Sequence, residues 1–540
     1  MQRSLLLRAG LILGGLLLGG LASQAGNGTG NQPDWINFAG HMLQYRQDVQ
    51  GNRLPDFSTA GYAEADAPIP MVPVVAHVQA AGDSSSGDDT PRIQAALDAL
   101  GAALPNVNGF RGALLLGPGS YHLAGTLQLR ASGVVLRGAG TGEGGSLLLA
   151  QGLPHTLLQV GVAGRWQSAG TRYALLDRYV PVGATTLEVQ AGNDLQVGDR
   201  IVVDWTMSPS FLHQIGMDRI PSRADGLPIV QWKPGMEVEF DRRIVRIEHT
   251  RFSARLTLNA PLTTPMSRGD GTTVWRYTFP ERIQQVGIEN LRADGTAFEQ
   301  APGFANPKSY ASGSVHFVGG GFFDSRLVQF NAVENSWMRN VTAARFSSIV
   351  ATGRGARALT IEHITGREIR APETHTAPEA FSIAGQQILV QHCSITGEYN
   401  HVWATQALVA GPVVFYDCTA TGSHLDAGPH QRWATGVLYD NLHLTGELRV
   451  VNRGNMGTGQ GWAGTSNVLW NCETEGYAVQ DTPVTYNWAF GTTGKLAAQT
   501  ASDRTGQVQS PGKHLLPTSL YQAQLEERRT GFGTRTSNSL

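Results

Sequence analysis

The segment Ile388-Leu-Val-Gln-His-Cys393 recurs in varied form through the second half of the chain. Each copy is a short β-rich run that ends in Asn, His or Asp, followed by one small or medium apolar residue. The other copies are Ser336-Trp-Met-Arg-Asn-Val341, Leu359-Thr-Ile-Glu-His-Ile364, Val413-Val-Phe-Tyr-Asp-Cys418, Val437-Leu-Tyr-Asp-Asn-Leu442 and Val468-Leu-Trp-Asn-Cys472. Their last residues follow one another at intervals of 23, 29, 25, 24 and 30 residues. A repeat of this length with one short strand per copy is typical of a solenoid.

The residue types of the repeat decide which solenoid this is. Gly, Thr, Asn and β-branched residues dominate the copies, which favours strands over the amphipathic helices of helical repeats. Propeller blades of about 40 residues do not fit the spacing. The sequence therefore predicts an all-β fold, a right-handed parallel β-helix whose coils stack about 4.8 Å apart. Glu289-Asn-Leu291 fits a further copy 50 residues before Val341, which predicts that the two lie two coils apart.

A helix is predicted on the N-terminal side of the repeats. Thr90 as N-cap and Pro91 at the first helical position begin the helical run that ends at Leu100. The acidic pair Asp88 and Asp89 is better explained by this cap than as metal ligands. Short strands separated by Gly-rich turns follow, at Gly112 to His122, Leu127 to Arg130 and Val134 to Gly140.

The stretch from Gly82 to Gly140 resembles the N-terminal cap and first coils of the pectate-lyase superfamily. The resemblance rests on Gly87-Asp-Asp-Thr90, Ile93-Gln94, Gly117-Pro-Gly-Ser-Tyr121 and Leu136-Arg-Gly-Ala-Gly140. It implies a right-handed parallel β-helix that is usually exported and usually acts on polysaccharide. The superfamily contains lyases, hydrolases, epimerases and phage tailspikes, so the reaction has to be inferred from the site.

Five segments are expected along the chain. They are a signal peptide at residues 1–25, an N-terminal segment with the capping helix and first coils at 26–179, an inserted β-module at 180–280, the main β-helix with the active-site face at 281–495, and a C-terminal tail and cap at 496–540. The loop of the module at 206–235 is rich in Trp, Met and Pro, and it is either a lid or substrate wall, or a structural excursion. An amphipathic helix at 519–529 is expected to cap or cover the solenoid.

Overall composition narrows the possible partners. The chain of 540 residues has 41 Lys and Arg against 43 Asp and Glu, and this near-neutral balance argues against bulk electrostatic capture of nucleic acid or of an anionic membrane. An odd number of cysteines argues against a disulfide framework. Cys393, Cys418 and Cys472 share one position of the repeat, where we expect small buried apolar residues.

The N-terminus has the features of a secretory signal peptide. Arg3 and Arg8 precede an apolar run from Leu11 to Leu21, and cleavage is predicted near Ala25. The apolar run is shorter than the roughly 20 residues that a spanning helix needs. We therefore expect a secreted or periplasmic protein, and a monomer.

Polar residues collect at one phase of the predicted solenoid. Asn400 and His401 lie 7 and 8 residues after Cys393, and His424 and Asp426 lie 6 and 8 residues after Cys418. His401 and Asp426 are therefore expected to project from neighbouring coils, about 5–8 Å apart. The longest repeats place their extra residues on the same side, which is often the binding side of a solenoid. Further candidates on this face are His430, Arg432, Trp433, Arg453 and Trp462.

These residue types suit an anionic sugar, because Arg pairs bidentately with a carboxylate and an indole can stack on a pyranose. For β-elimination beside a uronate, Arg432 and Arg453 are the predicted charge neutralisers and His430 or His401 is the predicted base. Asn400 is expected to help hold the carboxylate. Further substrate contacts are expected from Asp426, Trp433, Trp462, His424 and Glu379. In the competing interpretation, Arg432 neutralises Asp426 within a packed turn and Trp433 fills the core.

Two other functional classes remain open. A glycoside hydrolase needs paired carboxylates, and Asp426, Glu379 and Glu398 are available, although no Asp-Asp pair with a nearby Gly-His is present as in the pectinase hydrolases. A non-catalytic glycan-binding or tailspike-like surface protein is the third class. No metal ligand and no cofactor is firmly predicted, and calcium stays open because the expected cleft lacks a dense acidic cluster. The predicted partner is an anionic polysaccharide.

Overall fold

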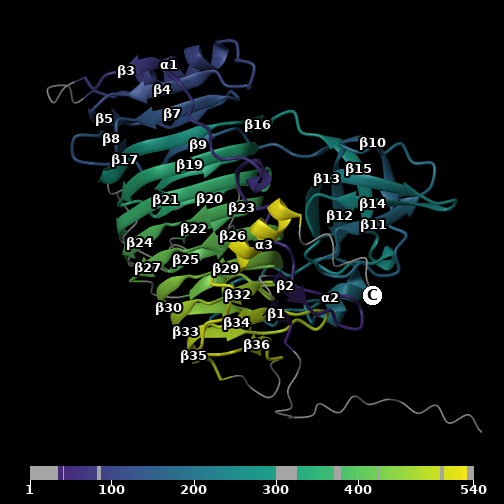
Figure 1. Cartoon of the computed structure of the whole chain (residues 1–540). Coiled ribbons are helices and arrows are strands. Elements are labelled where there is room, and N and C mark those ends of the chain that lie inside the picture. The colour runs from purple at the N-terminus through teal and green to yellow at the C-terminus, as the bar shows by residue number, and fades with distance from the viewer. Residues whose placement is uncertain are drawn as a thin grey trace, which may run out of the picture. The chain divides into compact units, whose positions relative to one another are not determined.

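The computed structural model is a right-handed parallel β-helix that carries an inserted β-module (Figure 1). It describes residues 34–39, 42–81, 87–298, 325–369, 379–397, 399–422, 426–498 and 504–531. The expected signal peptide at 1–25 and the candidate His424 lie outside these ranges. Within them, no helix combines the length and the apolarity that crossing a membrane requires.

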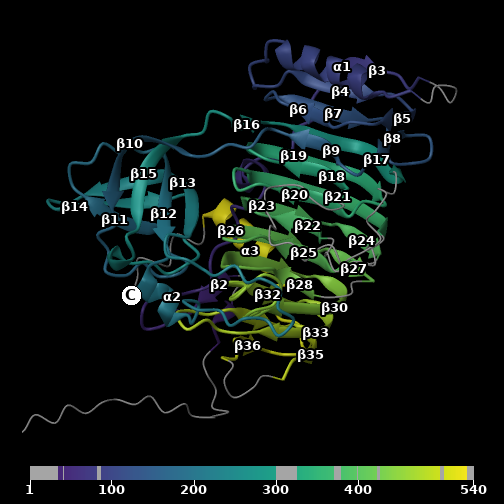
Figure 2. The ribbon, with the colours of Figure 1, turned by 180° about the vertical axis from the view of Figure 1, so that it is seen from behind.

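Strands of successive coils stack in three parallel rows, which confirms the predicted fold class (Figures 1 and 2). The first row contains β3 (Val74–Val78), β4 (Gly112–Leu116), β7 (Val134–Gly138), β17 (Gly287–Phe298), β19 (Val333–Ala344), β21 (Arg357–Ile369), β23 (Gln386–Gln391), β26 (Ala410–Tyr416), β29 (Ala434–Asp440), β32 (Val468–Trp470), β34 (Trp488–Phe490) and β36 (Gln507–Gln509). The second row contains β5 (Gly119–Leu123), β8 (Ser146–Gly152), β24 (Ser394–Gly397), β27 (Thr419–Thr421), β30 (His443–Val450), β33 (Glu473–Val479) and β35 (Thr493–Leu496), and the long strands β17, β19 and β21 continue into it. The third row contains β6 (Leu127–Leu129), β9 (Thr156–Val160), β18 (Arg326–Phe330), β20 (Ser348–Thr352), β22 (Glu379–Ile383), β25 (His401–Thr405) and β28 (Asp426–Pro429).

The polar residue near the end of each repeat makes the bend between the first two rows. These residues adopt a left-handed backbone with φ between 49° and 58°, and they are Asn290, Asn340, His363, His392, Asp417, Asn441 and Asn471. Asn, Asp and His are the non-glycine residues that tolerate this conformation best. Their place at the bend explains why each repeat ends in these residue types.

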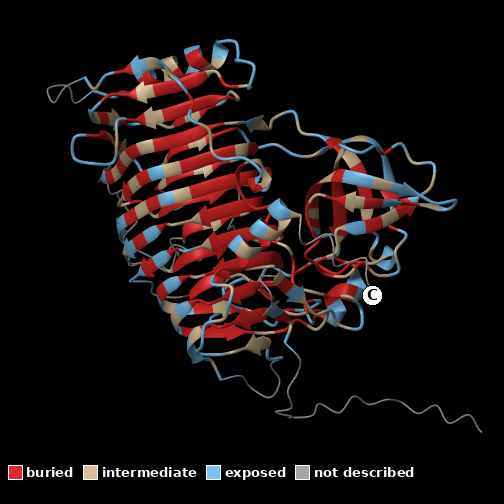
Figure 3. Cartoon of the chain, viewed as in Figure 1, coloured by how far each residue is buried: buried red, intermediate tan, exposed pale blue. Residues whose placement is uncertain are grey.

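Inward-facing side chains stack in columns along the solenoid. Ile361, Val390, Phe415 and Tyr439 are consecutive register partners, and all four are fully buried. The rings of Phe415 and Tyr439 lie parallel with centroids 5.3 Å apart. Figure 3 shows buried residues continuing from coil to coil. The predicted burial of the repeat cysteines is confirmed as well, for Cys393, Cys418 and Cys472.

The expected separation of Leu291 and Val341 is wrong. The two residues are direct register partners in β17 and β19, so they lie in adjacent coils rather than two coils apart. A coil can lengthen at a turn without adding a strand to the stack, and a sequence interval alone does not distinguish this from an additional coil.

The inserted module is an antiparallel sheet of six strands in the order β10-β15-β12-β13-β14-β11. Its elements are β10 (Gln167–Ala174), β11 (Thr186–Gln190), β12 (Arg200–Thr206), α2 (Pro209–Gln214), β13 (Glu237–His249), β14 (Ser253–Leu258) and β15 (Thr273–Thr278). The module begins one strand earlier than the expected boundary at residue 180, because β10 pairs with β15. The solenoid continues across the insertion, since Ile288 of β17 pairs with Leu136 of β7.

Helix α1 (Thr90–Ala102) covers the first coils, where Ile93, Leu97 and Leu100 join the solenoid core. Its N-cap is Asp89, one residue before the expected Thr90. Asp89 accepts hydrogen bonds from Arg92 and from the main chain of His122, which accounts for this acidic side chain within the fold.

The C-terminal helix α3 (Leu520–Thr530) covers the side of the solenoid rather than capping its end (Figure 1). Its Leu520, Tyr521 and Leu525 pack against outward-facing residues of the first row, among them Val414 and Leu438. The N-terminal segment joins the same cluster through β1 (Ile36–Ala39), β2 (Met42–Tyr45) and the residues that follow them. Of the two expected roles, capping or covering the solenoid, the helix takes the second.

Candidate functional site

Polar residues at the start of three consecutive third-row strands form the centre of the candidate site. Glu379, His401 and Asp426 are the first residues of β22, β25 and β28. Glu379 and His401 are register partners in neighbouring coils. Parallel stacking brings these strand starts to the same edge, so residues 22 to 25 positions apart in sequence become neighbours in space. The proximity that the repeat spacing predicted for His401 and Asp426 is confirmed.

His401, Asp426 and Arg453 form a buried ion-paired triad. Nδ1 of His401 lies 2.9 Å from Oδ1 of Asp426, and Arg453 donates through Nη2 to Oδ2 of the same carboxylate. The three side chains are 5 to 9% exposed. Burial by itself raises the pKa of Asp426, but His401 and Arg453 outweigh it and hold that pKa at about 2. Burial lowers the pKa of His401, but the contacts with Asp426 outweigh it and raise that pKa above its ordinary value.

A second imidazole and carboxylate lie beside the triad. Nδ1 of His430 is 2.7 Å from Oε1 of Glu379, although the ring nitrogen does not point along the line of a hydrogen bond. The rings of His430 and His401 approach with centroids 4.4 Å apart. Burial raises the pKa of Glu379, but the contacts with His430, Ser382 and His401 outweigh it and keep that pKa below its ordinary value. Both carboxylates of the cluster are therefore ionised near neutral pH.

Arg432 follows His430 by two residues, and its guanidinium is linked to Glu379 through the amides of Gln431 and Gln406. The half-buried side chain donates to Oε1 of Gln431, and to the main-chain and side-chain oxygens of Thr458 at 3.0 and 3.1 Å. All these acceptors are neutral, and in the described part of the chain Arg432 has no carboxylate as an ion-pair partner. Burial lowers the pKa of its guanidinium. The competing expectation of an Arg432–Asp426 pair is wrong, because Arg453 occupies that carboxylate.

The expected role of Arg453 also changes. Its side chain is 5% exposed and its charge is paired with Asp426, so it holds a carboxylate of the protein in place. A guanidinium already bound in this way is poorly placed to neutralise a carboxylate of a substrate. Asn400 is half-buried one residue before His401, and Glu398 lies outside the described residues.

The two candidate tryptophans are packing residues of the junction between module and solenoid. Trp433 is fully buried and Trp462 is 7% exposed, and both belong to the hydrophobic core of the module. The ring of Trp433 lies 6.3 Å from that of Trp205 in a stacked arrangement, and its Nε1 donates to Thr264. Neither indole offers a free face for a sugar, so the expected stacking role is corrected.

Uncharged polar side chains complete the site, and the sequence analysis did not single them out. The Gln460 amide nitrogen lies 2.9 Å from Nε2 of His430. Gln406 donates at 2.6 Å to both Glu379 and Ser382, and it accepts from Gln431 at 3.3 Å. A glutamine gives no chemical signal of its own. The only available clue was that Gln460 lies between two glycines, in a segment rich in candidates.

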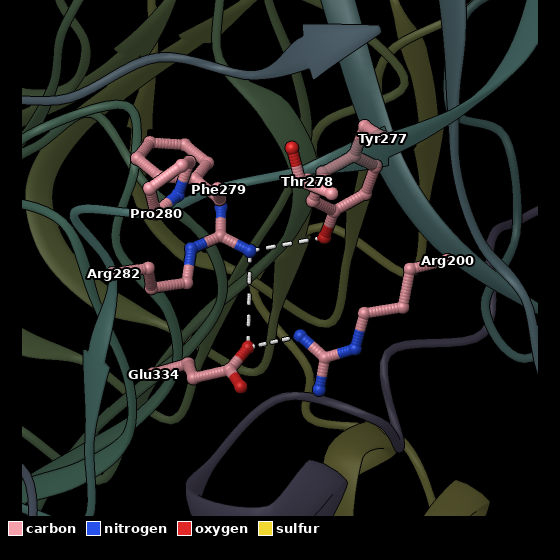
Figure 4. Close-up of a pocket in the computed structure, with 7 residues that line it drawn as sticks. All are labelled: Arg200, Tyr277, Thr278, Phe279, Pro280, Arg282 and Glu334. Atoms are coloured by element: carbon pink, nitrogen blue, oxygen red, sulfur yellow. Dashed lines mark hydrogen bonds and ion pairs between the residues drawn. The ribbon is translucent and has the colours of Figure 1, made fainter. Parts of the chain in front are cut away.

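A second polar cluster, distinct from the candidate site, also lies at the junction between module and solenoid. It borders a cavity of about 360 Å³, lined by Arg200, Tyr277, Thr278, Phe279, Pro280, Arg282 and Glu334 (Figure 4). Arg282 contacts Tyr277 at 3.0 Å and Glu334 at 3.7 Å, and Arg200 of the module pairs with the same glutamate. Behind them, Asp241 accepts from Arg282 at 2.7 Å. These ion pairs join β12 and β13 to the start of β19, so the cluster has a structural role in docking the module.

No known protein family matches the sequence, and no curated protein matches it. Solved structures with a similar fold include the tailspike protein gp49 of Pseudomonas phage LKA1, at 10% identity and a TM-score of 0.38, covering 79% of this chain and 70% of that one. The tailspike of Escherichia coli bacteriophage HK620, in complex with a pentasaccharide, is similar at 8% identity and a TM-score of 0.38, covering 84% and 61%. The endo-xylogalacturonan hydrolase of Aspergillus tubingensis is similar at 11% identity and a TM-score of 0.33, covering 81% and 92%.

Proposed function

We propose that this protein is an exported enzyme that cleaves a uronate-containing polysaccharide by β-elimination. The observation that carries the proposal is the half-buried guanidinium of Arg432, which has only neutral partners among the described residues. It is linked through Gln431 and Gln406 to a cluster in which two imidazoles each contact a carboxylate. A partly buried positive charge without a counter-charge favours an anionic ligand. Arg presents a planar pair of donors that matches a carboxylate.

The reaction assigns one task to each group. Arg432 pairs with the uronate carboxylate and stabilises the negative charge that develops when the C5 proton leaves. His430 accepts that proton through Nε2, where the substrate replaces the Gln460 amide as its partner, and the Glu379 carboxylate 2.7 Å from Nδ1 stabilises the imidazolium that results. The electron pair of the C5–H bond becomes the C4=C5 double bond as the C4–O4 bond breaks.

The second imidazole supplies the proton that the leaving oxygen needs. The contacts with Asp426 raise the pKa of His401 above its ordinary value, which favours the protonated imidazole that an acid must supply. Its Nδ1 faces Asp426 at 2.9 Å, which leaves Nε2 to donate to O4. Two adjacent imidazoles with different partners can thus serve as base and acid in the same step.

The same geometry disfavours hydrolysis at this cluster. A glycoside hydrolase needs one carboxylic acid that is protonated before the bond breaks, next to a carboxylate that is ionised. Here the pKa of Glu379 and that of Asp426 are both lowered, and both side chains already contact an imidazole. Neither can serve as the proton donor at neutral pH.

The test is incubation of the full-length mature protein with a panel of anionic polysaccharides, followed by mass analysis of the products. Elimination gives oligosaccharides with an unsaturated uronate at the new end, each lighter by one water than the corresponding hydrolysis product. Saturated products would replace the proposal with hydrolysis. Saturable binding without any product would identify a glycan-binding protein instead.

A further inference from the structure

One turn of the solenoid, residues 453–462, contacts three residues of the candidate site, which are Asp426, His430 and Arg432. Arg453 pairs with Asp426, and Gln460 contacts Nε2 of His430. The main-chain and side-chain oxygens of Thr458 accept from Arg432. The positions of the triad, of the His430 imidazole and of the Arg432 guanidinium therefore all depend on the conformation of this one turn.

The module holds that turn from the opposite side, through residues 215–232. Arg223 donates to the main-chain oxygen of Gly457 at 3.0 Å, and Trp232 donates to that of Gly459 at 3.3 Å. The main-chain nitrogen of Val230 donates to Thr458 at 2.8 Å. Two hydrogen bonds run in the other direction, from Asn455 to the main chain of Ser222 and from Trp462 to that of Ile215, at 3.1 and 2.9 Å.

Two glycines of the turn permit this close contact. Gly459 and Gly461 have φ values of +86° and +60°, in the left-handed region that favours glycine. A Cβ added to Gly461 would lie 2.6 Å from the sulfur of Met217 and 2.8 Å from the Trp232 ring. A Cβ added to Gly459 would lie 2.8 Å from Ile229. The turn is therefore fitted against the module over its whole second half.

We propose that residues 215–232 of the module position the catalytic cluster by holding the turn 453–462, with Arg223 and Trp232 as positioning residues. The inference rests on the proposed function for its catalytic consequence, but the positioning of His430 is independent of the reaction. Because residues 215–232 are bonded to the turn at five points, the proposal makes this part of the module a fixed support for the site rather than a lid.

The experiment compares wild type with Trp232→Phe, Arg223→Ala and Gly461→Ala in the full-length mature protein. Trp232→Phe removes one donor and keeps an aromatic ring in place, so it tests the hydrogen bond with little loss of packing. The matched control is Arg255→Ala, since Arg255 is an exposed module residue whose ion-pair partner among the described residues is Glu188 of the module. The first measurement is the NMR titration of the His430 imidazole without substrate, and the second is turnover of a uronate polymer with its kcat and KM.

We expect the His430 titration to be displaced in all three variants and unchanged in Arg255→Ala. We expect kcat to fall by about 10- to 100-fold, with a smaller change in KM, because misplacement of a catalytic group by about 1 Å has costs of this order. A His430 titration that superimposes on wild type in Trp232→Phe and Gly461→Ala would overturn the positioning role. If the wild type cleaves no uronate polymer, the proposed function fails and the titration still decides the positioning role.

Discussion

Asp426 should make the stability of this protein depend on pH in a way that Asp426→Asn removes. Its carboxyl ordinarily titrates at 3.8, and in the folded protein at about 2. The difference corresponds to about 2 kcal/mol of folding free energy, because one pKa unit is about 1.4 kcal/mol. Side-chain exposure of 9% means that solvent screens this interaction little.

The direction of each pKa shift decides the pH range in which the contact between Asp426 and His401 stabilises the fold. A carboxyl with a lowered pKa contributes stability that is fully present above its ordinary pKa of 3.8 and is lost as the pH falls through about 2. The partner imidazole of His401 has a raised pKa, so its contribution is present below its ordinary pKa of 6.5 and is lost as the pH rises through the folded value. Both pKa shifts arise from the contact between Asp426 and His401, so its free energy is counted once. This contact stabilises the fold most between pH 3.8 and pH 6.5, the two ordinary pKa values.

The assay is chemical denaturation of wild type and Asp426→Asn at about pH 5, 3 and 2. Between about pH 5 and about pH 2, the free energy of unfolding should fall by about 2 kcal/mol more for wild type than for the variant. The other carboxyls titrate in both proteins, so their effect cancels in this comparison. At about pH 5 the variant should also be less stable by about 3–5 kcal/mol, because it leaves the buried charge of Arg453 unpaired. Equal pH dependence in the two proteins would refute the ion-paired triad.

Three further substitutions test other parts of the account. Arg432→Lys keeps the positive charge but loses the paired donors of the planar guanidinium. Turnover should therefore fall by about 10²- to 10³-fold while the melting temperature stays nearly constant. A normal rate would remove Arg432 from the site. Trp433→Ala should cost about 3–5 kcal/mol in urea denaturation by leaving a cavity at the junction with the module, and a cost below about 1 kcal/mol would contradict that packing. Asp241 lies 2.7 Å from Arg282 and 3.9 Å from the buried Arg357. Asp241→Asn removes this fully buried counter-charge and should cost about 3–5 kcal/mol, whereas unchanged stability would argue against the network.

The solenoid could be predicted because its bends have a chemical signature. A left-handed residue must occur once per coil between the first two rows, and Asn340, His392 and Asp417 are residue types that tolerate it. The spacing failed at Leu291 and Val341, because an interval of 50 residues can separate adjacent coils as well as alternate ones. The first strand of the module was missed for another reason. Residues Gln167–Ala174 are mostly exposed, so they lack the alternation of apolar residues that indicates a strand.

The candidate site was predictable only where it follows the repeat. Counting from Cys393 and Cys418 brought His401 next to Asp426, because parallel stacking converts equal phase into proximity. The partners of Trp433 and Trp462 could not be found in this way. Trp433 packs on Trp205, and Trp462 bonds to Ile215, both from the inserted module more than 200 positions earlier in the chain. No repeat relates the module to the coil that it contacts, so spacing could not predict these two packing roles.

The most direct test of the central claim follows the ultraviolet absorbance of the new C4=C5 double bond during cleavage of a uronate polymer, with wild type, His430→Gln and Arg255→Ala in parallel. The account predicts that absorbance rises for wild type and for Arg255→Ala at equal rates. For His430→Gln, which should remain folded by thermal melting, the rate should fall by at least about 100-fold because the base is lost. Cleavage by wild type without any rise in absorbance, or an equal rise with folded His430→Gln, would contradict β-elimination at this cluster.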